Sequence, residues 1–235
     1  AWVGYSSTQE GDRLIDLQQP YGSGGFLHSG AFARLVLDLR RSKWDAAALA
    51  MPIHDNPAAG YATSGVLLDL RADVSPRLWD VEEIWGSLEG SIAGYLGLGG
   101  NGRLALSVRM GGKWTWGQTP YFGAAFLGGG SVISGGATAR GFQVQRFAGE
   151  ASLYGNADVR LFLVRVNLVV PCDLGLNAFA DAGRVFVSGE SSDDWHPSGG
   201  GGIWLAPLVR TNTLTFSVAA SGENVLYYLR AGFHY

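Results

Sequence analysis

The chain has 235 residues, 36 of them glycine, and a formal net charge of -3 at pH 7. Only 16% of its residues are charged and 47% are hydrophobic, whereas an ordinary soluble domain carries roughly 25% charged residues. This composition disfavours a disordered chain and a helical bundle. The weak negative charge, without a basic stripe, argues against a nucleic-acid partner.

The sequence also limits how the chain could meet a membrane. It holds no stretch of 18 apolar residues, which excludes a transmembrane helix, so a spanning chain would have to cross as strands. No signal peptide is visible after Ala1, which predicts either a mature chain or a trimmed fragment. Cys172 is the one cysteine, so no internal disulfide can form, and we expect its thiol to be buried or to face lipid.

Alternating apolar and polar residues predict spanning strands in the first half of the chain. Strands of a membrane barrel are roughly ten residues long, apolar toward lipid and polar toward the lumen. Four segments follow this period, and their apolar residues are Ala31, Ala33, Leu35, Leu37 and Leu39; Val66, Leu68 and Leu70; Leu88, Ile92 and Leu96; and Leu104, Leu106, Val108 and Met110. Their polar residues are Arg34, Asp38 and Arg40; Asp69, Arg71 and Asp73; Glu89, Ser91 and Tyr95; and Arg103, Ser107 and Arg109. Residues 99–102 (Gly-Gly-Asn-Gly) predict a tight hairpin.

The same alternation continues after residue 150. The apolar residues are Ala157, Val159, Leu161 and Leu163, then Leu174, Leu176, Ala178 and Ala180; the opposing polar residues are Asn156, Asp158 and Arg160, then Asn177 and Asp181. In the last segment one face carries Val225, Tyr227, Leu229, Ala231, Phe233 and Tyr235, and the other carries Tyr228, Arg230 and His234. A helix would scatter these charges around its circumference. A soluble β-sandwich also alternates, but the long segments, with Arg and Asp together on one face, favour a barrel.

We therefore predict an all-β fold, an antiparallel transmembrane β-barrel of about 10–12 strands, in one domain of residues 1–235. Six or so strands should precede a long inward loop at about residues 112–155, and the others should follow it. Residues 188–202 are rich in Gly, Ser and Asp and predict a second long loop. Aromatic residues near segment ends suggest an interfacial girdle: Trp79, Trp85, Trp114, Trp116 and Tyr121.

Several short motifs follow one another in the second half of the chain. They are Pro120-Tyr121-Phe122 with Leu127-Gly128-Gly129, Arg140-Gly141-Phe142, Arg146 to Glu150 with Tyr154 to Arg160, Phe179-Ala180-Asp181-Ala182-Gly183, and Ser198 to Gly202. In this order, and with the aromatic last strand, residues 118–235 resemble the C-terminal barrel region of the BamA/TamA family of bacterial surface antigens. Asp158 stands where that family usually has glutamate.

The resemblance implies a bacterial outer-membrane location, with outer-membrane lipids and client outer-membrane or secreted polypeptides as partners, and without a cofactor. It also implies that the aromatic last strand is a signal read by the assembly machinery, formed by Tyr227, Leu229, Phe233 and Tyr235. Family barrels have sixteen strands and usually follow periplasmic POTRA modules, which 235 residues cannot supply. We expect either the C-terminal part of a sixteen-stranded barrel or a reduced barrel.

The resemblance further implies that Arg140 lies at the tip of a loop folded into the barrel. A buried guanidinium must be paired, and strand phase places Asp158 and Asp181 in the lumen on adjacent strands. We expect Arg140 to fork between these carboxylates, with Gly141 permitting a sharp bend and Phe142 packing on the inner wall. The motif that would lock the loop comprises Arg140, Gly141, Phe142, Asp158, Asp181 and Gly183. The alternative is that these are solvated loop or lumen residues.

Three functions remain open. The resemblance implies insertion or translocation of polypeptides, through a weak seam whose unpaired strand edge could template an incoming strand. Alternatively, the barrel anchors a separate domain such as a phosphoesterase or a patatin-type lipase. The third function is catalysis by the chain itself, but the sequence holds no Gly-x-Ser-x-Gly elbow and no phosphate loop. Its histidines, which lack metal-ligand spacing, are His28, His54, His196 and His234. We therefore expect neither a catalytic nor a metal site.

Overall fold

The computed structural model describes residues 1–8, 18–41, 61–98, 103–130, 137–167, 169–191, 193–209, 212–233 and 235. Ten strands form one antiparallel sheet in the order β1-β2-β3-β4-β5-β8-β9-β10-β11-β12. The first five are β1 Trp2–Ser7, β2 Gly25–Asp38, β3 Ser64–Ser75, β4 Trp85–Leu98 and β5 Leu104–Gly117. The last five are β8 Ala151–Asn167, β9 Pro171–Phe186, β10 His196–Pro207, β11 Leu214–Ser221 and β12 Val225–Ala231. The predicted all-β antiparallel fold is confirmed.

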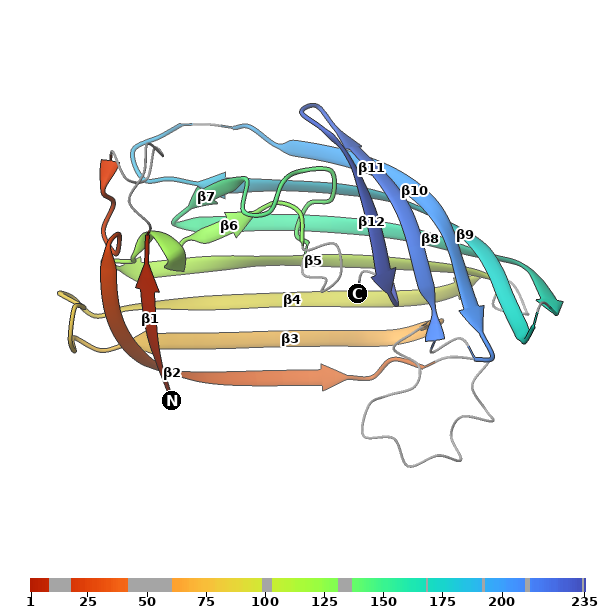
Figure 1. Ribbon diagram of the computed structural model, residues 1–235, viewed down its shortest axis with the longest axis horizontal. Helices are drawn as coiled ribbons and strands as arrows, with labels where there is room; N and C mark the ends of the chain where they lie inside the picture. Colours follow the sequence, from red (N-terminus) through yellow and green to blue (C-terminus); the bar gives the residue numbers. More distant parts are fainter. Residues whose placement is uncertain are drawn as a thin grey trace.

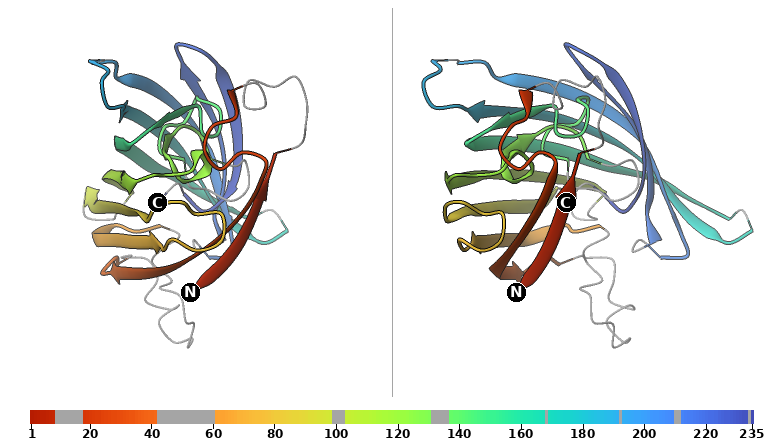
Figure 2. Two further views of the ribbon diagram at one scale, coloured as in Figure 1. Left: turned by 90° about the vertical axis from the view of Figure 1, so that its left-hand side faces the viewer. Right: turned by 60° about the vertical axis from the view of Figure 1, so that its left-hand side comes forward.

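The sheet is strongly curved. In Figure 1, β3, β4 and β5 run side by side along the long axis, and β9 to β12 curl over them. Figure 2 shows the sheet curling round the segment between β5 and β8, which lies on its concave side. The two end strands are β1 and β12. Within the described ranges, no helix has the length and apolar character needed to cross a membrane.

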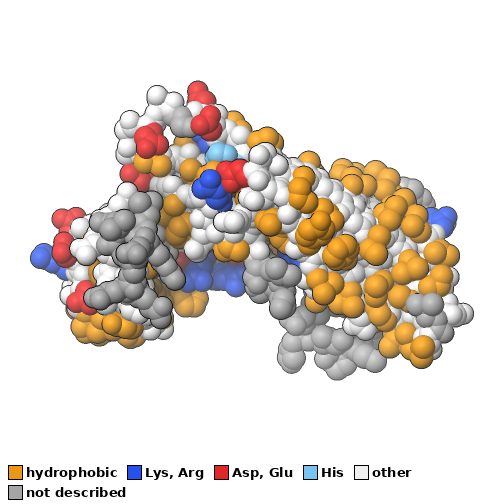
Figure 3. Space-filling model, turned by 45° about the horizontal axis from the view of Figure 1, so that its top comes forward, with side chains coloured by type: hydrophobic (Ala, Val, Ile, Leu, Met, Phe, Trp, Pro, Cys, Tyr) orange, Lys and Arg blue, Asp and Glu red, His pale blue; other side chains and the backbone are white. Residues whose placement is uncertain are grey.

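Alternation along each strand sorts the side chains between the two faces. On β4, Leu96 is 54% exposed on the convex face, whereas its neighbour Tyr95 is 6% exposed on the concave face. The same division holds on β5, where Met110 is exposed and Ser107 is buried. Figure 3 shows the apolar side chains gathered over the right-hand part of the molecule. The apolar faces predicted from the sequence therefore form the outside of the sheet.

The concave side is filled by separate apolar clusters. One joins Phe26, Val81 and Trp85, and another joins Tyr61 and Trp204 with two alanines. A third joins Phe142 and other residues of the inward loop to Tyr154 of the wall. Trp85 is therefore an interior residue and not part of an interfacial girdle, because it occupies the inward phase of β4, opposite in phase to Leu88. Trp79 and Trp114, in contrast, are exposed.

Several boundaries differ from the sequence prediction. The inward loop occupies residues 118–150 and is shorter than the predicted range of 112–155. The reason is that β5 continues to Gly117 and β8 already begins at Ala151. Five strands of the large sheet precede this loop, and five follow it. The loop expected at residues 188–202 ends before His196, since the glycine run lies within β10. The expected hairpin at residues 99–102 lies outside the described residues, although β4 and β5 are antiparallel neighbours, as such a hairpin requires.

The last strand is shorter than its alternating pattern. β12 ends at Ala231, and the chain bends at Gly232, which adopts a positive φ of 80°. The outward row stops there: Tyr227 is 63% exposed, but Phe233 packs against Trp204 in the interior. The prediction that Phe233 and Tyr235 continue the outward face is therefore wrong. Alternation of apolar and polar residues shows which face of a strand a side chain takes. It does not show where a glycine turn ends the strand.

Candidate functional site

The candidate site is the place where the inward loop meets the concave wall. The loop carries a one-turn helix, η3 Tyr121–Gly123, and a two-stranded sheet of β6 Ala125–Leu127 and β7 Phe147–Gly149. Lys113 of β5 fastens the start of the loop, because its Nζ donates to the carbonyl oxygens of Gly123 at 2.8 Å and Ala124 at 3.1 Å. At the end of the loop, the carbonyl of Glu150 accepts from the Thr115 hydroxyl at 2.9 Å, so both ends of the loop are held to β5.

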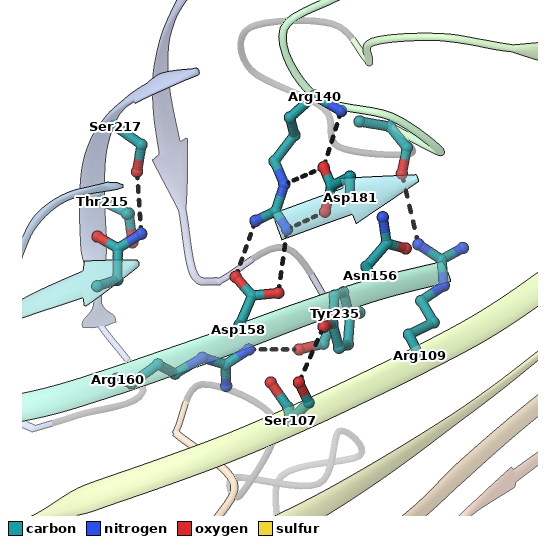
Figure 4. Close-up of polar contacts among 12 residues, drawn as sticks. Ser107, Arg109, Arg140, Asn156, Asp158, Arg160, Asp181, Thr215, Ser217 and Tyr235 are labelled. Atoms are coloured by element: carbon teal, nitrogen blue, oxygen red, sulfur yellow. Dashed lines mark hydrogen bonds and ion pairs between the residues drawn. The ribbon is translucent and has the colours of Figure 1, made fainter. Parts of the chain in front are cut away.

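Arg140 forks between two carboxylates of adjacent strands (Figure 4). Its Nε and Nη2 donate to Asp181 of β9 at 2.7 and 2.5 Å. Its Nη1 and Nη2 donate to Asp158 of β8 at 2.8 and 3.1 Å, and its backbone N–H also donates to Asp181 at 2.9 Å. The structure thus brings together the three charged residues that the sequence placed in one group.

This ion cluster is withdrawn from water. The side chains of Arg140, Asp158 and Asp181 are 6%, 3% and 0% exposed. Burial alone would lower the pKa of Arg140, but the hydrogen bonds and charges of Asp181 and Asp158 outweigh it and hold that pKa above its usual value. The Phe179 ring supports the cation, with its centroid 3.7 Å from the Arg140 Cζ. The guanidinium is therefore a permanent charge with bonds in its plane and an aromatic face against it.

Gly141 joins the loop tip to the last two strands. Its N–H donates to the Tyr228 hydroxyl at 3.0 Å, and its carbonyl accepts from the Ser221 hydroxyl at 2.8 Å. Gly141 has a φ of 87°, a conformation in which a side chain is strained. A Cβ there would also lie 3.1 Å from the carbonyl carbon of Ala220. Glycine thus allows both the bend and the close approach to β11 and β12.

Replacing Gly141 should measure this close approach. We expect Gly141→Ala to lower the free energy of unfolding by more than the roughly 1–2 kcal/mol that a left-handed backbone costs, as measured by denaturant unfolding in detergent. Gly189→Ala is the matched control, because Gly189 has a φ of 85° with no heavy atom within 4 Å of its added Cβ. Equal losses for the two variants would show that the loop tip has room to spare.

Phe142 and Gly183 form the apolar side of the site. Phe142 is buried with Leu127 and Tyr154, and its ring contacts Phe147 edge-to-face at 5.3 Å. Leu127 lies directly over Gly183 of β9, where an added Cβ would meet the Leu127 side chain. The absence of a side chain at Gly183 therefore allows the loop to pack closely against β9. Its position in the Phe-x-Asp-x-Gly motif did not reveal this role.

Sequence reasoning missed several wall residues that hold the loop. Asn156 of β8 donates to the carbonyl of Thr138 at 3.1 Å, and Arg109 of β5 donates to the carbonyl of Ala137 at 3.5 Å. Tyr228 and Phe179 were identified only by strand phase or by motif. Their inward phase was visible in the alternation, but no local pattern tells which inward residue meets a distant loop.

The residues expected to form the C-terminal signal divide between the two faces. Tyr227 and Leu229 lie on the convex face, 63% and 58% exposed. Phe233 and Tyr235 lie inside, where the Tyr235 hydroxyl donates to the carbonyl of Ser107 at 3.2 Å. The role of these residues as a signal stays a prediction.

The site offers ion pairing and packing. Among the residues that the structure describes, no group of three or more His, Cys, Asp or Glu side chains is placed to hold a metal ion. His196 stacks on the Phe147 ring at 3.7 Å, and His28 packs against Trp2 and Phe122. His54 and His234 lie outside the described residues. The geometry is that of a fastening between loop and wall.

Comparison with known proteins gives a likeness in fold. No family model and no curated protein matches the sequence. Among solved structures, the chain is similar to BamA from Haemophilus ducreyi lacking POTRA domains 1–3, with a TM-score of 0.51 and 13% sequence identity. The match covers 88% of this chain and 49% of that chain, so the chain spans about half the length of that structure. The fold is therefore a BamA-like barrel fold.

Proposed function

We propose that this chain is a barrel domain of the bacterial outer membrane that inserts or translocates other polypeptides. Its convex face supports the lipid part of the proposal. Large apolar side chains are exposed on most strands of the sheet, among them Leu35, Leu70, Ile92 and Met110. Soluble monomers rarely expose contiguous apolar patches of more than a few hundred Å², so we assign this face to outer-membrane lipids.

The observation that carries the assembly part is the position of the last strand. β12 pairs with β11 along one edge, and no described residue pairs with its other edge. An open strand edge offers unsatisfied N–H and C=O groups to an incoming strand. On its inner side, β12 is bound by the Arg140 loop through Tyr228. A client strand would therefore meet an edge that pairs with no strand of the described sheet and that is supported from within.

Reconstitution tests this function. We expect the folded chain in phospholipid vesicles to accelerate, several-fold over empty vesicles, the folding of a urea-denatured small outer-membrane barrel. Folding of that client is followed on unboiled gels, where a closed barrel migrates faster than its boiled form. A test variant replaces Val225, at the start of β12, with proline, which removes a backbone donor from that edge. This variant should accelerate client folding less than the unchanged chain.

The alternative is a membrane anchor for a fused phosphoesterase or patatin-type lipase. In that case the chain would insert into vesicles and remain heat-modifiable itself, but it would leave the client's folding rate unchanged. This result would contradict the assembly function while keeping the outer-membrane barrel. Failure of the chain to associate with vesicles or with the outer-membrane fraction of cells would contradict both.

A further inference from the structure

Phe233 and Tyr235, here called the aromatic pair, enter the interior through a turn that the wall holds in place. The N–H of Gly232 donates to the carbonyl of Thr213 at 2.7 Å, and the Thr215 hydroxyl donates to the carbonyl of Gly232 at 2.9 Å. Both threonines are buried. Both backbone polar groups of Gly232, its N–H and its carbonyl, are thus hydrogen-bonded, as is usual for buried backbone groups.

Side chains of the interior surround the Phe233 ring. Its ring lies 5.7 Å from the Tyr61 ring and 5.8 Å from the Trp204 ring, both edge-to-face. The Cζ of Arg160 lies 4.2 Å from its centroid, a cation–π contact. Trp204 is itself oriented, because its Nε1 donates to the carbonyl of Leu176 at 3.1 Å. Phe233 therefore sits between two aromatic rings and the Arg160 guanidinium.

Tyr235 crosses from β12 toward β5. Its main-chain oxygen accepts from the Arg160 Nη2 at 3.1 Å, and its hydroxyl donates to the carbonyl of Ser107 at 3.2 Å. Its ring lies 6.4 Å from that of Tyr95. The pair thus ties the end of β12 to β4, β5 and β8, which lie well away from it in the order of the sheet.

Two wall residues touch both the aromatic pair and the Arg140 loop. Asp158 accepts two bonds from Arg140, and Figure 4 shows its side chain with Arg140 on one side and Tyr235 on the other. Arg109 lies 5.7 Å from the Tyr235 ring centroid and 3.5 Å from the carbonyl oxygen of Ala137 in the loop. The two inserts therefore share one polar network.

We propose that the aromatic pair is a clasp that couples the end of the last strand to the Arg140 loop. When the pair leaves the interior, Asp158 and Arg109 lose contacts that help to place the loop. When the loop leaves, the same residues lose contacts that help to place Tyr235. Such coupling is reciprocal, so each insert must stabilise the other by the same factor. This inference does not depend on the insertion activity proposed above.

Hydrogen exchange of the folded full chain in detergent tests the coupling. The loop peptide holds the amides of Arg140 and Gly141, both of which donate to the wall. Tyr235→Phe removes one hydroxyl, and we expect the loop amides to exchange on the order of fivefold faster, as the loss of one hydrogen bond implies. Phe233→Ala should produce a larger acceleration. Tyr227→Phe is the matched control, since Tyr227 is 63% exposed on the convex face, and it should change nothing.

The reverse experiment uses Arg140→Ala and follows the amide of Gly232, which should exchange faster. The coupling is refuted if Tyr235→Phe and Phe233→Ala accelerate exchange at Gly232 but leave the loop amides within twofold of the unchanged chain. It is also refuted if Arg140→Ala frees the loop alone. Should Phe233→Ala fail to fold, Tyr235→Phe still decides the matter, because it retains the ring. Client folding in vesicles is a separate readout, so failure of the proposed function is distinguishable.

Discussion

Arg140→Ala should destabilise the folded chain by about 3–5 kcal/mol, because it leaves two buried carboxylates without their counter-charge. Asp158 and Asp181 have side chains that are 3% and 0% exposed, so water cannot replace the lost bonds. The loss should appear as a lower denaturant midpoint in detergent. Protease should also cleave the 118–150 segment more rapidly, since this loop would no longer be fastened to β8 and β9.

Arg146→Ala is the matched control for this experiment. Arg146 is in the same loop and pairs with Glu223 at 2.7 Å, but the two side chains are 46% and 34% exposed. An exposed pair contributes about 0–1 kcal/mol. Adding Asp181→Asn to Arg140→Ala should recover part of the stability, because it removes one unpaired charge. If Arg140→Ala behaves like Arg146→Ala, the loop is not locked by charge.

Gly200→Ala should be the second large effect, a loss of about 1–3 kcal/mol from overpacking. An added Cβ would meet the backbone oxygen of Val218 on β11 and would lie 2.6 Å from the Cζ of Phe179. The strand or the ring must move, and the Phe179 ring is the face on which Arg140 rests. Unfolding by denaturant should show the loss, and the protease should detect the loosened loop.

Gly199→Ala, one residue earlier, separates packing from glycine content. Its Cβ would meet only the carbonyl oxygen of Phe179, at 3.4 Å. Replacing a strand glycine in open space reduces the entropy of the unfolded chain, which stabilises by a few tenths to about 1 kcal/mol. The two variants should therefore change stability in opposite directions. A stabilising Gly200→Ala would mean that β10 and β11 are less tightly packed than the structure has them.

Strand phase explains how much of the site was predictable. Asp158 and Asp181 occupy inward positions beside apolar residues that point outward, such as Val159 and Ala180, so their shared lumen followed from a period of two. Their meeting with Arg140 depended on the resemblance, since strand phase does not locate a loop. Trp85 was misplaced because nearness to a segment end says nothing about phase. Phe233 and Tyr235 were misplaced because one glycine at 232 ends the strand.

The role of Gly200 was also beyond the reach of the sequence. A run of glycines predicts a loop by composition, yet this run lies inside β10 between Phe179 and Val218. Its purpose is close approach between neighbouring strands, which only tertiary structure reveals.

The interior network also has a kinetic meaning. The bond between Gly141 and Tyr228 joins residues 87 apart in the chain, and that between Tyr235 and Ser107 joins residues 128 apart. Contacts of such separation carry a large loop-closure entropy, which falls once the intervening hairpins are paired. Pairs of strands that lie close together in the chain, such as β8 with β9 and β11 with β12, therefore have the advantage early in folding. The loop and the aromatic pair would then pack against a sheet that is already curved, and this late step would stabilise its curvature.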